Sequence, residues 1–387
     1  MREKPLRGIR VLDFSRVLSG PFAGRMFADL GADVVKVEPP EGDVTRYWGE
    51  VRNGLSGFYT QQNAGKRNVC IDLKHPQGAE VARSLAAVAD VVIENYRPGV
   101  MERLGLGWPA LMALNPRLVM LSISGFGATG PDAGRAAYAT VVQAESGWVS
   151  RQAEFDDVAP TDAAISVADM NAGLHGMVAV LSALLMRERT STGQWIDMSM
   201  LDSMLCTDDY MHHAADQSVS VRQGGEFWDA PGGPLLLAGD FRYIWRQASS
   251  VHGLADPSPP GADIPTKAAA RRSAVADWMR AFSERTALVA ALDAANIPWA
   301  DVVDHRRALD TPQATARGAF AVVDDRGGGE RRVVQSPYRF SDADAGVAGP
   351  APFRGEHNSE VLREWLDATE DEVAGLDSTG ALPSEPR

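Results

Sequence analysis

The chain reads Ile9-Arg10-Val11-Leu12-Asp13-Phe14 near its start and Asp33-Val34-Val35-Lys36-Val37-Glu38 shortly afterwards. Both runs are short, apolar and rich in β-branched residues, which is typical of buried strands. Between them lies Ser19-Gly20-Pro21, and a helical pattern follows from Phe22 to Leu30. The serine of this turn is the predicted N-cap, and Gly31 is a good residue to end the helix. The segment therefore predicts a strand, a helix and a second, parallel strand.

The same alternation continues along the chain. Further strands are predicted at Val69–Leu73, Val91–Ile93, Leu118–Ser124 and Gln194–Met200, and helices from about Pro76 to Ala89 and from Met170 to Arg187. Short strands that alternate with helices form a mostly parallel sheet with helices on both faces. The predicted fold class is therefore α/β.

A length of 387 residues is too great for one ordinary core and favours two domains. Glycine and proline cluster beyond Ser218, and a helical stretch follows at about 266–295. We predict a large domain over 1–219, a smaller α+β domain over 220–325, and a return segment, 326–387, that completes the large domain. The return segment should contain a helix near 359–366 and end in an acidic, frayed tail.

The net charge of −13 argues against non-specific nucleic-acid binding. The two cysteines, Cys70 and Cys206, form no spaced motif, which suits a reducing cytoplasm. The N-terminus has no apolar signal region, and the longest strongly apolar stretch, Met177–Met186, is too short to span a bilayer. We therefore expect a cytoplasmic protein without a membrane partner.

Two segments resemble cofactor-binding motifs, but each lacks residues that the motif requires. The glycines Gly20, Gly24 and Gly31 do not fit the G-x-G-x-x-G pattern, so a nicotinamide-dependent enzyme is not favoured. Asp208 and His212 are spaced as neighbours on one helix face, but no third ligand follows at a suitable spacing. We predict no metal site and read this segment as a solvated or interfacial helix.

Basic residues gather at predicted strand ends and in the loops that follow them, namely Lys36, Lys66, Arg67, Lys74, Arg97 and Arg103. Loops at the carboxyl ends of parallel strands are where α/β proteins bind ligands. Each residue alone is also explained as ordinary solvated charge. As a set they suggest a phosphate-bearing ligand.

Asp169 stands where an extended segment becomes the long apolar helix. A carboxylate there is costly to bury unless it is paired or hydrogen-bonded. From the spacing alone, Asp169 is best explained as the N-cap of the helix. A catalytic role is compatible with that position, because the N–H groups of a helix start favour negative charge.

Several motifs together resemble the class III CoA-transferases, the family of formyl-CoA transferase, carnitine CoA-transferase and α-methylacyl-CoA racemase. The resemblance runs over nearly the whole chain and rests on Gly8–Asp13 with Ser19–Ala23, Ala28–Pro39, Gly65–Asn68, Glu94–Gly99, Arg103–Gly107, Ser122–Gly127, Thr192–Met200 and Ala351–His357.

This resemblance implies a catalytic role for Asp169, which occupies the place of the family's catalytic aspartate. It implies a homodimer of two interlocked, ring-like subunits, each with a Rossmann-like large domain and a small domain. No permanently bound cofactor is expected, and coenzyme A is a substrate. The residues that match the family's CoA contacts are Val17, Leu18, Leu73, Lys74, Asn95, Tyr96, Arg97 and Arg103.

The chain departs from the family pattern in three places. Pro39 replaces an arginine found in some relatives, and Ala139 stands where many members have an aspartate. The glycine-rich loop that shields the active site in formyl-CoA transferase is matched only weakly, by Gly232-Gly233-Pro234. These departures concern phosphate contacts, substrate choice and loop closure.

The expected reaction moves CoA from an acyl-CoA thioester to a carboxylic acid. The carboxylate of Asp169 attacks the thioester carbonyl, and an aspartyl mixed anhydride and CoA thiolate result. An ordinary aspartate is less basic than a thiol by roughly 4.6 pKa units, or about 6 kcal/mol, so the protein must stabilise the thiolate. It must also exclude water from the anhydride.

Two alternatives remain. An acyl-CoA racemase needs two acid–base groups on opposite faces of the α-carbon, and the family's histidine is missing near Tyr138. A catalytically silent CoA-binding dimer is the other alternative, and the retention of Asp169 favours activity over it.

Overall fold

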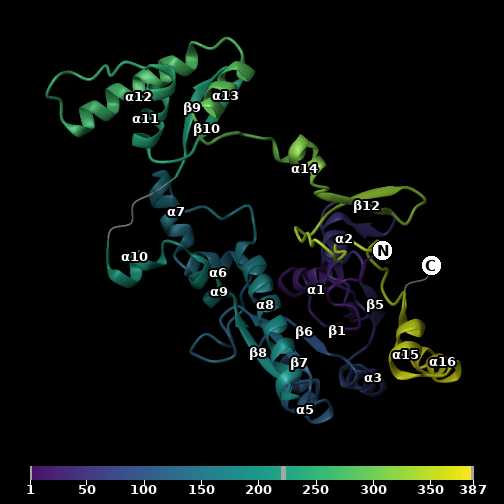
Figure 1. Cartoon of the computed structure of the whole chain (residues 1–387). Helices are drawn as coiled ribbons and strands as arrows, with labels where there is room; N and C mark the ends of the chain where they lie inside the picture. Colours follow the sequence, from purple (N-terminus) through teal and green to yellow (C-terminus); the bar gives the residue numbers. More distant parts are fainter. Residues whose placement is uncertain (1, 219–223, 385–387) are drawn as a thin grey trace. The chain divides into compact units, whose positions relative to one another are not determined.

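The computed structural model describes residues 2–218 and 224–384, and Figure 1 shows its helices and strands. The chain forms two compact units, one of Met1–Ala215 with Thr315–Arg387 and one of Asp216–Ala314, which are called here the large and the second unit. The predicted boundary at 219/220 lies outside the described residues. The predicted end of the small domain, residue 325, lies beyond the last residue of the second unit. The assignment of domains stays a prediction.

The large unit is built on one six-stranded parallel sheet. Its strands are β1 (Arg10–Asp13), β2 (Asp33–Glu38), β5 (Arg67–Cys70), β6 (Val91–Glu94), β7 (Val119–Ser124) and β8 (Gln194–Ser199). Their order across the sheet is β5-β2-β1-β6-β7-β8, and all five adjacent pairs are parallel. The predicted parallel α/β sheet is therefore confirmed.

The strand order reverses between β1 and β6. From β1 the chain adds strands toward one edge, through β2 to β5, and then returns to the other side of β1 with β6. The loops that follow β1 and β6 consequently diverge and leave a crevice between them. Ligands of open α/β sheets bind at such a point, outside the carboxyl ends of the strands.

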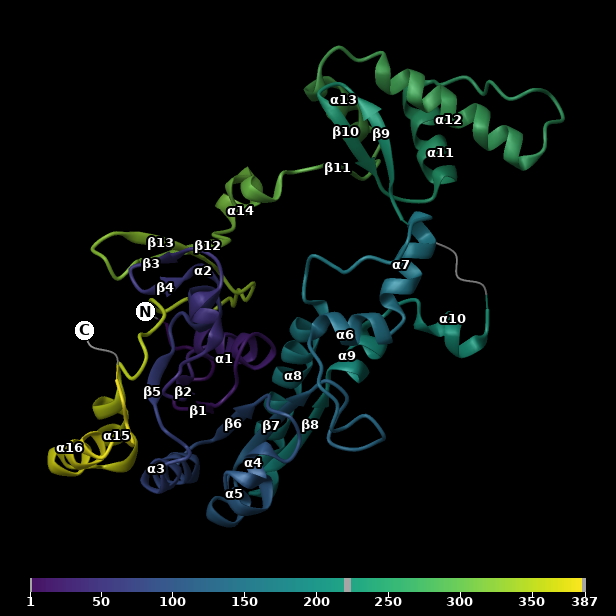
Figure 2. The same cartoon turned by 180° about the vertical axis from the view of Figure 1, so that it is seen from behind.

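The sheet is covered on both faces because its side chains alternate. Val11 of β1 packs in one core cluster with Phe27 of helix α1 (Ser19–Asp29) and Val180 of helix α8 (Val167–Thr190). The next residue, Leu12, packs on the opposite face with side chains of α3 (Pro76–Ala87), α5 (Trp108–Leu114) and α15 (Asn358–Leu366). Figure 2 shows the same elements from behind.

The first helix begins earlier than predicted. It starts at Ser19, with Leu18 as the N-cap and no side-chain cap, so the prediction of Ser19 as N-cap was wrong. The first helical hydrogen bond, from the Phe22 N–H to the Leu18 carbonyl at 2.8 Å, already encloses the serine. The hydroxyl is thereby free for the contacts described below. Gly31 follows the helix with φ of 97°, as predicted.

Shorter elements complete the large unit. They are η1 (Val44–Tyr47), β3 (Val51–Arg52), β4 (Leu55–Ser56), α2 (Gly57–Asn63), α4 (Val100–Arg103), α6 (Ala139–Glu145), α7 (Trp148–Asp156), α9 (Met200–Thr207), α10 (Met211–Asp216), β12 (Phe320–Asp324) and β13 (Glu330–Val334). Helix α14 (Pro312–Ala316) spans the point where the chain passes from the second unit to the large one.

The C-terminal segment is more ordered than predicted. The expected helix near 359–366 is present as α15, but the predicted frayed tail contains a further helix, α16 (Glu370–Ser378). Thr369 and Glu372 form a reciprocal capping box at its start. Because this box satisfies two terminal N–H groups and Val373 is buried, the acidic composition does not unfold the segment.

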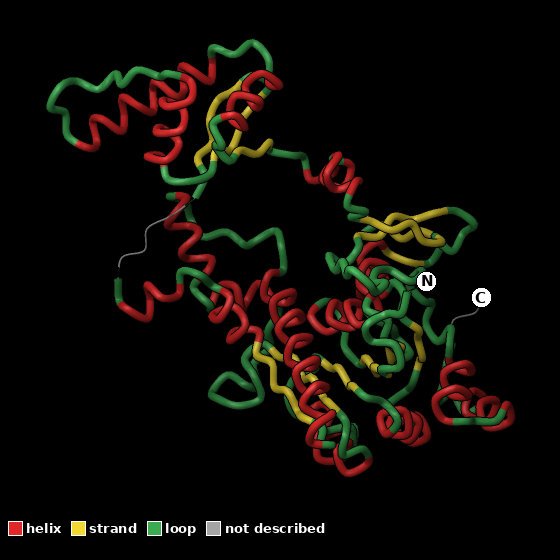
Figure 3. The backbone as a smooth tube through the Cα atoms, in the orientation of Figure 1, coloured by secondary structure: helices red, strands yellow, loops and turns green. Residues whose placement is uncertain are grey.

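The second unit has its own core. Strands β9 (Glu226–Ala230), β10 (Gly233–Leu237) and β11 (Trp299–Asp301) form an antiparallel sheet, and helices α11 (Phe241–His252), α12 (Ile264–Arg280) and α13 (Arg285–Ala294) pack with it; η2 (His305–Asp310) follows. Figure 3 distinguishes these strands and helices by colour. The helical stretch predicted for about 266–295 is two helices. The weakly matched glycine-rich loop is the β9–β10 hairpin turn.

Helix α8 is long and apolar enough, by length and composition alone, to cross a membrane. It is longer than the apolar stretch considered in the sequence. In the structure it packs against α1, β7 and β8, and Ala172 and Val180 lie in the core cluster. Core helices of globular proteins pass the same test, so a single helix of this kind is weak evidence for a membrane span.

Candidate active site

A cavity of about 330 Å³ opens at the point where the strand order reverses. Its walls come from the loop after β1, the loop after β6, the segments 123–125 and 135–138, and the first turns of α8 and α9. The lining residues that carry the argument are Arg16, Val17, Ser19, Tyr96, Arg97 and Asp169. Sheet topology therefore brings Asp169 to the place where this class of fold binds ligands.

Asp169 is the third residue of α8, and the N-cap is Ser166, so the N-cap interpretation of Asp169 was wrong. The carboxylate instead accepts hydrogen bonds from the hydroxyl and the backbone N–H of Ser19. Burial raises the pKa of Asp169 to about 6, and the two bonds from Ser19 offset only part of that effect. No cation contributes to this balance. The carboxylate is unusually basic and has no counter-ion among residues 2–218 and 224–384.

Ser19 is held by Asn95. The Asn95 side-chain amide donates to the Ser19 hydroxyl at 3.1 Å and to the Arg16 carbonyl at 2.7 Å, and its oxygen accepts from the Arg16 N–H at 2.8 Å. On the other side, α8 approaches Ser19 closely at Gly173. A Cβ there would lie 2.8 Å from the Ser19 carbonyl oxygen. The glycine therefore permits the contact between α1 and α8 that brings Asp169 to Ser19.

The start of α8 is also fixed from α6. The side chain of Gln143 is fully buried, and its oxygen accepts from the Ala168 N–H at 3.3 Å. This satisfies one of the terminal N–H groups of the helix beside Asp169. Gln143 thus accepts the hydrogen bond that the side chain of an N-cap residue accepts in other helices.

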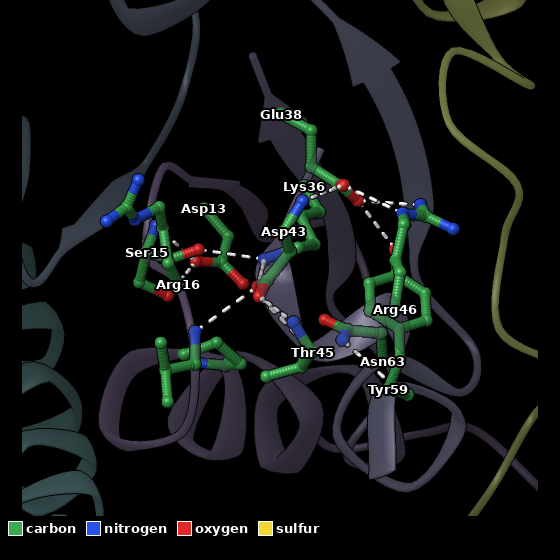
Figure 4. Close-up of polar contacts among 12 residues, drawn as sticks. Asp13, Ser15, Arg16, Lys36, Glu38, Asp43, Thr45, Arg46, Tyr59 and Asn63 are labelled. Atoms are coloured by element: carbon green, nitrogen blue, oxygen red, sulfur yellow. Dashed lines mark hydrogen bonds and ion pairs between the residues drawn. The ribbon is translucent and has the colours of Figure 1, made fainter. Parts of the chain in front are cut away.

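The loop after β1 is strained. Val17 has φ of 67°, a left-handed conformation that a β-branched residue rarely adopts. Its N–H donates to Asp43 at 3.2 Å. Lys36 donates to the Ser15 carbonyl at 2.8 Å and lies 3.1 Å from the same carboxylate of Asp43. These contacts, drawn in Figure 4, hold the loop in its strained form.

Beneath this loop lies a network of buried ion pairs. Lys66 donates to Asp13 at 2.8 Å, to the Pro21 carbonyl and to Asn63, so all three of its protons are used. The Lys36 and Lys66 side chains have no exposed surface. Arg67 is paired with Asp33, Glu360 and Glu364. The prediction that these three cations bind a phosphate was therefore wrong, because carboxylates distant in sequence already neutralise them.

The predicted CoA contacts divide into two groups. Val17, Asn95, Tyr96 and Arg97 line the cavity of Asp169. The other four do not line it: Leu18 is buried behind the loop, Leu73 and Lys74 follow β5, and Arg103 ends α4. The exposed Lys74 lies 4.0 Å from Glu41. The structure thus joins half of the set to Asp169, and the role of all eight stays a prediction.

Sequence reasoning missed two residues of this cavity. Ser19, the hydrogen-bond donor to Asp169, was assigned to a helix cap. Arg16, which lies over the ring of Tyr96 at 5.6 Å, was not considered. Arg16 lies in the loop after β1 and Ser19 is the first residue of the helix that follows it, so the rule that ligands bind where the strand order reverses would have identified them once that order was known.

A second cavity, of about 290 Å³, lies on the other side of the segment 96–98. Glu94, the last residue of β6, is buried in its wall and accepts from the Tyr96 N–H at 2.8 Å. Burial raises the pKa of Glu94 to about 7. Its protonation state therefore changes near neutral pH, beside the loop that carries Asn95 and Arg97.

The acidic and histidine-rich segment after α9 is not one helix face. Asp208 is the C-cap of α9 and pairs with Arg151 at 2.6 Å, whereas His212 belongs to α10. Within residues 2–218 and 224–384, no three histidine, cysteine, aspartate or glutamate side chains are grouped so as to hold a metal ion.

Comparison with known proteins gives one consistent result. The model of CoA-transferase family III matches residues 6–358. The succinate–glutarate CoA-transferase of Agrobacterium fabrum is 34% identical over 94% of this chain and 96% of its own length. The formyl-CoA:oxalate CoA-transferase of Streptomyces avermitilis is 31% identical over 98% of this chain and 100% of its own.

A solved structure agrees with these relatives. The CAIB/BAIF family protein from Brucella suis superposes with a TM-score of 0.80, at 31% identity over 94% of this chain and 100% of that one. The resemblance noted in the sequence is confirmed. The chain belongs to CoA-transferase family III, and it is a CoA-transferase.

Proposed function

We propose that this enzyme transfers CoA from an acyl-CoA to a carboxylic acid, with Asp169 as the covalent nucleophile. The observation that carries the proposal is a carboxylate that has no counter-ion in the described part of the chain, with its pKa raised to about 6, in a cavity where the strand order reverses. A buried carboxylate of purely structural role is normally paired. Asp169 is instead left reactive.

The chemistry proceeds by exchange of acyl groups. The Asp169 carboxylate attacks the donor thioester, the C–S bond breaks, and a mixed anhydride and CoA thiolate form. The thiolate then attacks the aspartyl carbonyl, which releases the donor acid and leaves CoA as an aspartyl thioester. The acceptor carboxylate attacks this thioester, and the thiolate finally takes the acceptor acyl group and frees Asp169.

The raised pKa eases the first step. An ordinary aspartate is about 4.6 pKa units less basic than a thiol, but with a pKa of about 6 for Asp169 the gap falls to roughly 2.5 units. The corresponding free-energy gap falls from about 6 to about 3 kcal/mol. At pH 7 the group is still mostly ionised, so no neighbouring base is required. Burial thus makes the nucleophile stronger without abolishing its charge.

We place CoA along the large unit through Val17, Leu18, Leu73, Lys74, Asn95, Tyr96, Arg97 and Arg103. Support comes from the cavity, which four of them line, and from Arg97 and Arg103, for which no carboxylate partner is found among the described residues. The Rossmann-like character of the domain is supported by the strand order, which is that of doubly wound nucleotide-binding sheets.

The relatives suggest the class of acid. Succinate, glutarate and oxalate, which appear in the names of the two relatives, are all dicarboxylic acids. We propose that this enzyme also uses a dicarboxylate as donor acid, acceptor acid or both. Racemisation is less well supported, because Arg135, Ala136, Ala137 and Tyr138 supply the wall where a second acid–base group would be needed.

The test of the nucleophile is Asp169→Asn, which keeps the shape of the side chain and removes its charge. The variant should fold like the wild type, but transfer from succinyl-CoA to glutarate should be abolished. Mass spectrometry should detect the aspartyl adduct in the wild type and not in the variant. Ser182→Ala, on the exposed side of the same helix, is the control and should retain turnover. Near wild-type transfer by Asp169→Asn would refute the assignment.

We also propose that the active form is an interlocked homodimer in the cytoplasm. Support comes from the outer face of α8, where Leu174, Val178 and Leu185 are 42%, 62% and 66% exposed. An apolar stripe of this kind normally contacts another chain. Sedimentation at low protein concentration tests the proposal, and a folded, active monomer would contradict it.

A further inference from the structure

The Asp169 cavity contains three arginines in different electrostatic states. Arg135 is neutralised by Glu145 and Asp132. Arg16 and Arg97 have no hydrogen bond or ion pair to their guanidinium groups among the described residues, although Arg16 lies over the Tyr96 ring. Two arginines without a carboxylate partner and one carboxylate without a cationic partner, among the described residues, therefore share one cavity.

Arg16 is positioned rather than loose. Asn95 binds its backbone N–H and carbonyl at 2.8 and 2.7 Å, and the ring of Tyr96 lies beneath its guanidinium at 5.6 Å. The next residue, Val17, is held in its left-handed conformation by Asp43. A cation fixed in this way loses little conformational entropy when it binds an anion.

Arg16 is also close to the reacting carboxylate along the chain. It precedes Ser19, which hydrogen-bonds to Asp169, by three residues, and three residues span at most roughly 10–11 Å. The long arginine side chain extends from that backbone into the same cavity. An acyl group held on Asp169 and the guanidinium of Arg16 therefore face one cavity of about 330 Å³, which is small enough to suit a short molecule with two anionic ends.

A dicarboxylate meets an electrostatic cost in this cavity. Its first carboxylate must approach the ionised Asp169 or its acyl derivative, and its second adds another negative charge to a partly buried site. Two like charges close together repel each other more strongly in a partly buried site than in bulk water, because the effective dielectric constant there is lower. A monocarboxylate of equal length avoids the second charge. A free, bidentate cation at the far end reverses this order of preference.

We propose that Arg16 binds the second carboxylate of a short dicarboxylic acid and so determines the acid specificity of the enzyme. The inference rests on the proposed CoA transfer at Asp169 and deepens it by naming the residue that recognises the acid. Arg97 follows β6 and matches a family CoA contact, so it is assigned to CoA. Arg16 matches none of the residues implied to contact CoA.

The experiment compares succinate with butyrate, which has the same carbon chain and one carboxylate fewer. KM for each acid and the affinity for CoA are measured for wild type, Arg16→Gln, Arg16→Lys and Arg135→Gln. Arg16→Gln should raise KM for succinate about ten-fold or more, since a charge-assisted contact contributes about 1.5–3 kcal/mol. KM for butyrate and CoA affinity should not change, and Arg16→Lys should restore part of the preference. Arg135→Gln, a change at an already neutralised arginine, should leave the ratio of the two KM values unchanged.

Three results would overturn the inference. They are an equal loss for both acids, a loss of CoA affinity in Arg16→Gln, which would assign Arg16 to a CoA phosphate, and no change at all. Binding of succinate to Asp169→Asn in the presence of CoA, measured by calorimetry, separates the inference about Arg16 from the proposed function. If that binding depends on Arg16 while wild type transfers CoA to no acid, the recognition stands and the transfer proposal fails. If wild type transfers CoA but succinate binding ignores Arg16, the reverse holds.

Discussion

Asp13 is fully buried and Asp169 is partly buried, and the surroundings of these two aspartates of the large unit give them opposite properties. Burial acts to raise the pKa of both. At Asp13, the ammonium groups of Lys66 and Lys36 outweigh burial and lower the pKa. At Asp169, only the hydrogen bonds of Ser19 oppose burial, and the pKa rises to about 6. The residue type is the same, and the presence of a cation decides the outcome.

The comparison separates a structural carboxylate from a reactive one. Asp13 helps to hold the end of β1, because it accepts from the Ser15 N–H, and Lys36 and Asp43 hold the Ser15 carbonyl and the Val17 N–H that follow. Asp169 keeps its charge available, because no cation among the described residues neutralises it. The buried lysines of the described chain therefore pair with the carboxylates that hold the loop beside the site, and none of them pairs with the proposed nucleophile.

The largest expected effect comes from breaking the structural pair. Lys66→Met leaves the Asp13 carboxylate buried without its main partner, and the free energy of unfolding should fall by about 3–5 kcal/mol. Urea denaturation measures it. The double variant Asp13→Asn/Lys66→Met should recover much of the loss, since no buried charge is then left unpaired.

The matched control is Arg83→Met, which removes the exposed pair with Glu80. It should cost less than about 1 kcal/mol. Equal losses for Lys66→Met and Arg83→Met would show that burial of the Asp13–Lys66 pair is not what makes it important.

Glu94 extends the comparison to a carboxylate whose proton is retained by burial. Its pKa of about 7 in the folded state, against an ordinary 4.5, means that folded protein binds this proton more tightly than unfolded protein. The resulting stability is fully present below about pH 4.5 and is lost as the pH rises through 7. The difference amounts to about 3 kcal/mol.

Glu94→Gln cannot titrate and keeps an oxygen for the Tyr96 N–H. Its stability relative to wild type should therefore increase steadily between pH 5 and pH 8, as measured by denaturation at several pH values. A difference between the two proteins that does not change with pH would contradict the raised pKa.

The smallest expected effect concerns Ser19. Transfer requires ionised Asp169, so the wild-type rate should fall as the pH decreases below about 6. Ser19→Ala removes the hydroxyl that favours the ionised form of Asp169. The acid limb of the profile of kcat against pH should therefore move to a higher pH, by about one pH unit. Ser182→Ala should not move it. A downward shift in Ser19→Ala would show that the hydroxyl favours the protonated form.

Local sequence patterns were sufficient to predict the strands of the sheet, but they were insufficient to predict the last helix of the chain that the structure describes. The strand Asp33–Glu38 was predicted with its observed bounds, because its β-branched run is bounded by Gly31 and Pro39. Helix α16 was missed although its Thr369-x-x-Glu372 capping signal is visible in the sequence, because its acidic composition suggested disorder. Composition misleads where a specific cap supplies the missing bonds.

The site was predicted through resemblance more than through local chemistry. Asp169 was selected because of its place in the family motif, whereas its spacing suggested a helix cap. Lys36 and Lys66 were misassigned because their partners, Asp43 and Asp13, are recognisable only after the strands pair. Arg16 and Ser19 were missed because the reversal of strand order is a property of the sheet and not of any one segment.

The C-terminal return segment also affects the order in which the two units can complete their folding. Strand β5, at one edge of the sheet, relies on residues near the end of the chain: Cys70 N–H donates to Asn358, and Asn68 accepts from Gly355 N–H. The second unit is continuous, from Asp216 to Ala314, and has its own core. That unit can therefore be complete before residues 355–358 are synthesised, and the nascent large unit exposes its β5 edge until they are. Chaperone contact with this enzyme should therefore concentrate on the part synthesised first.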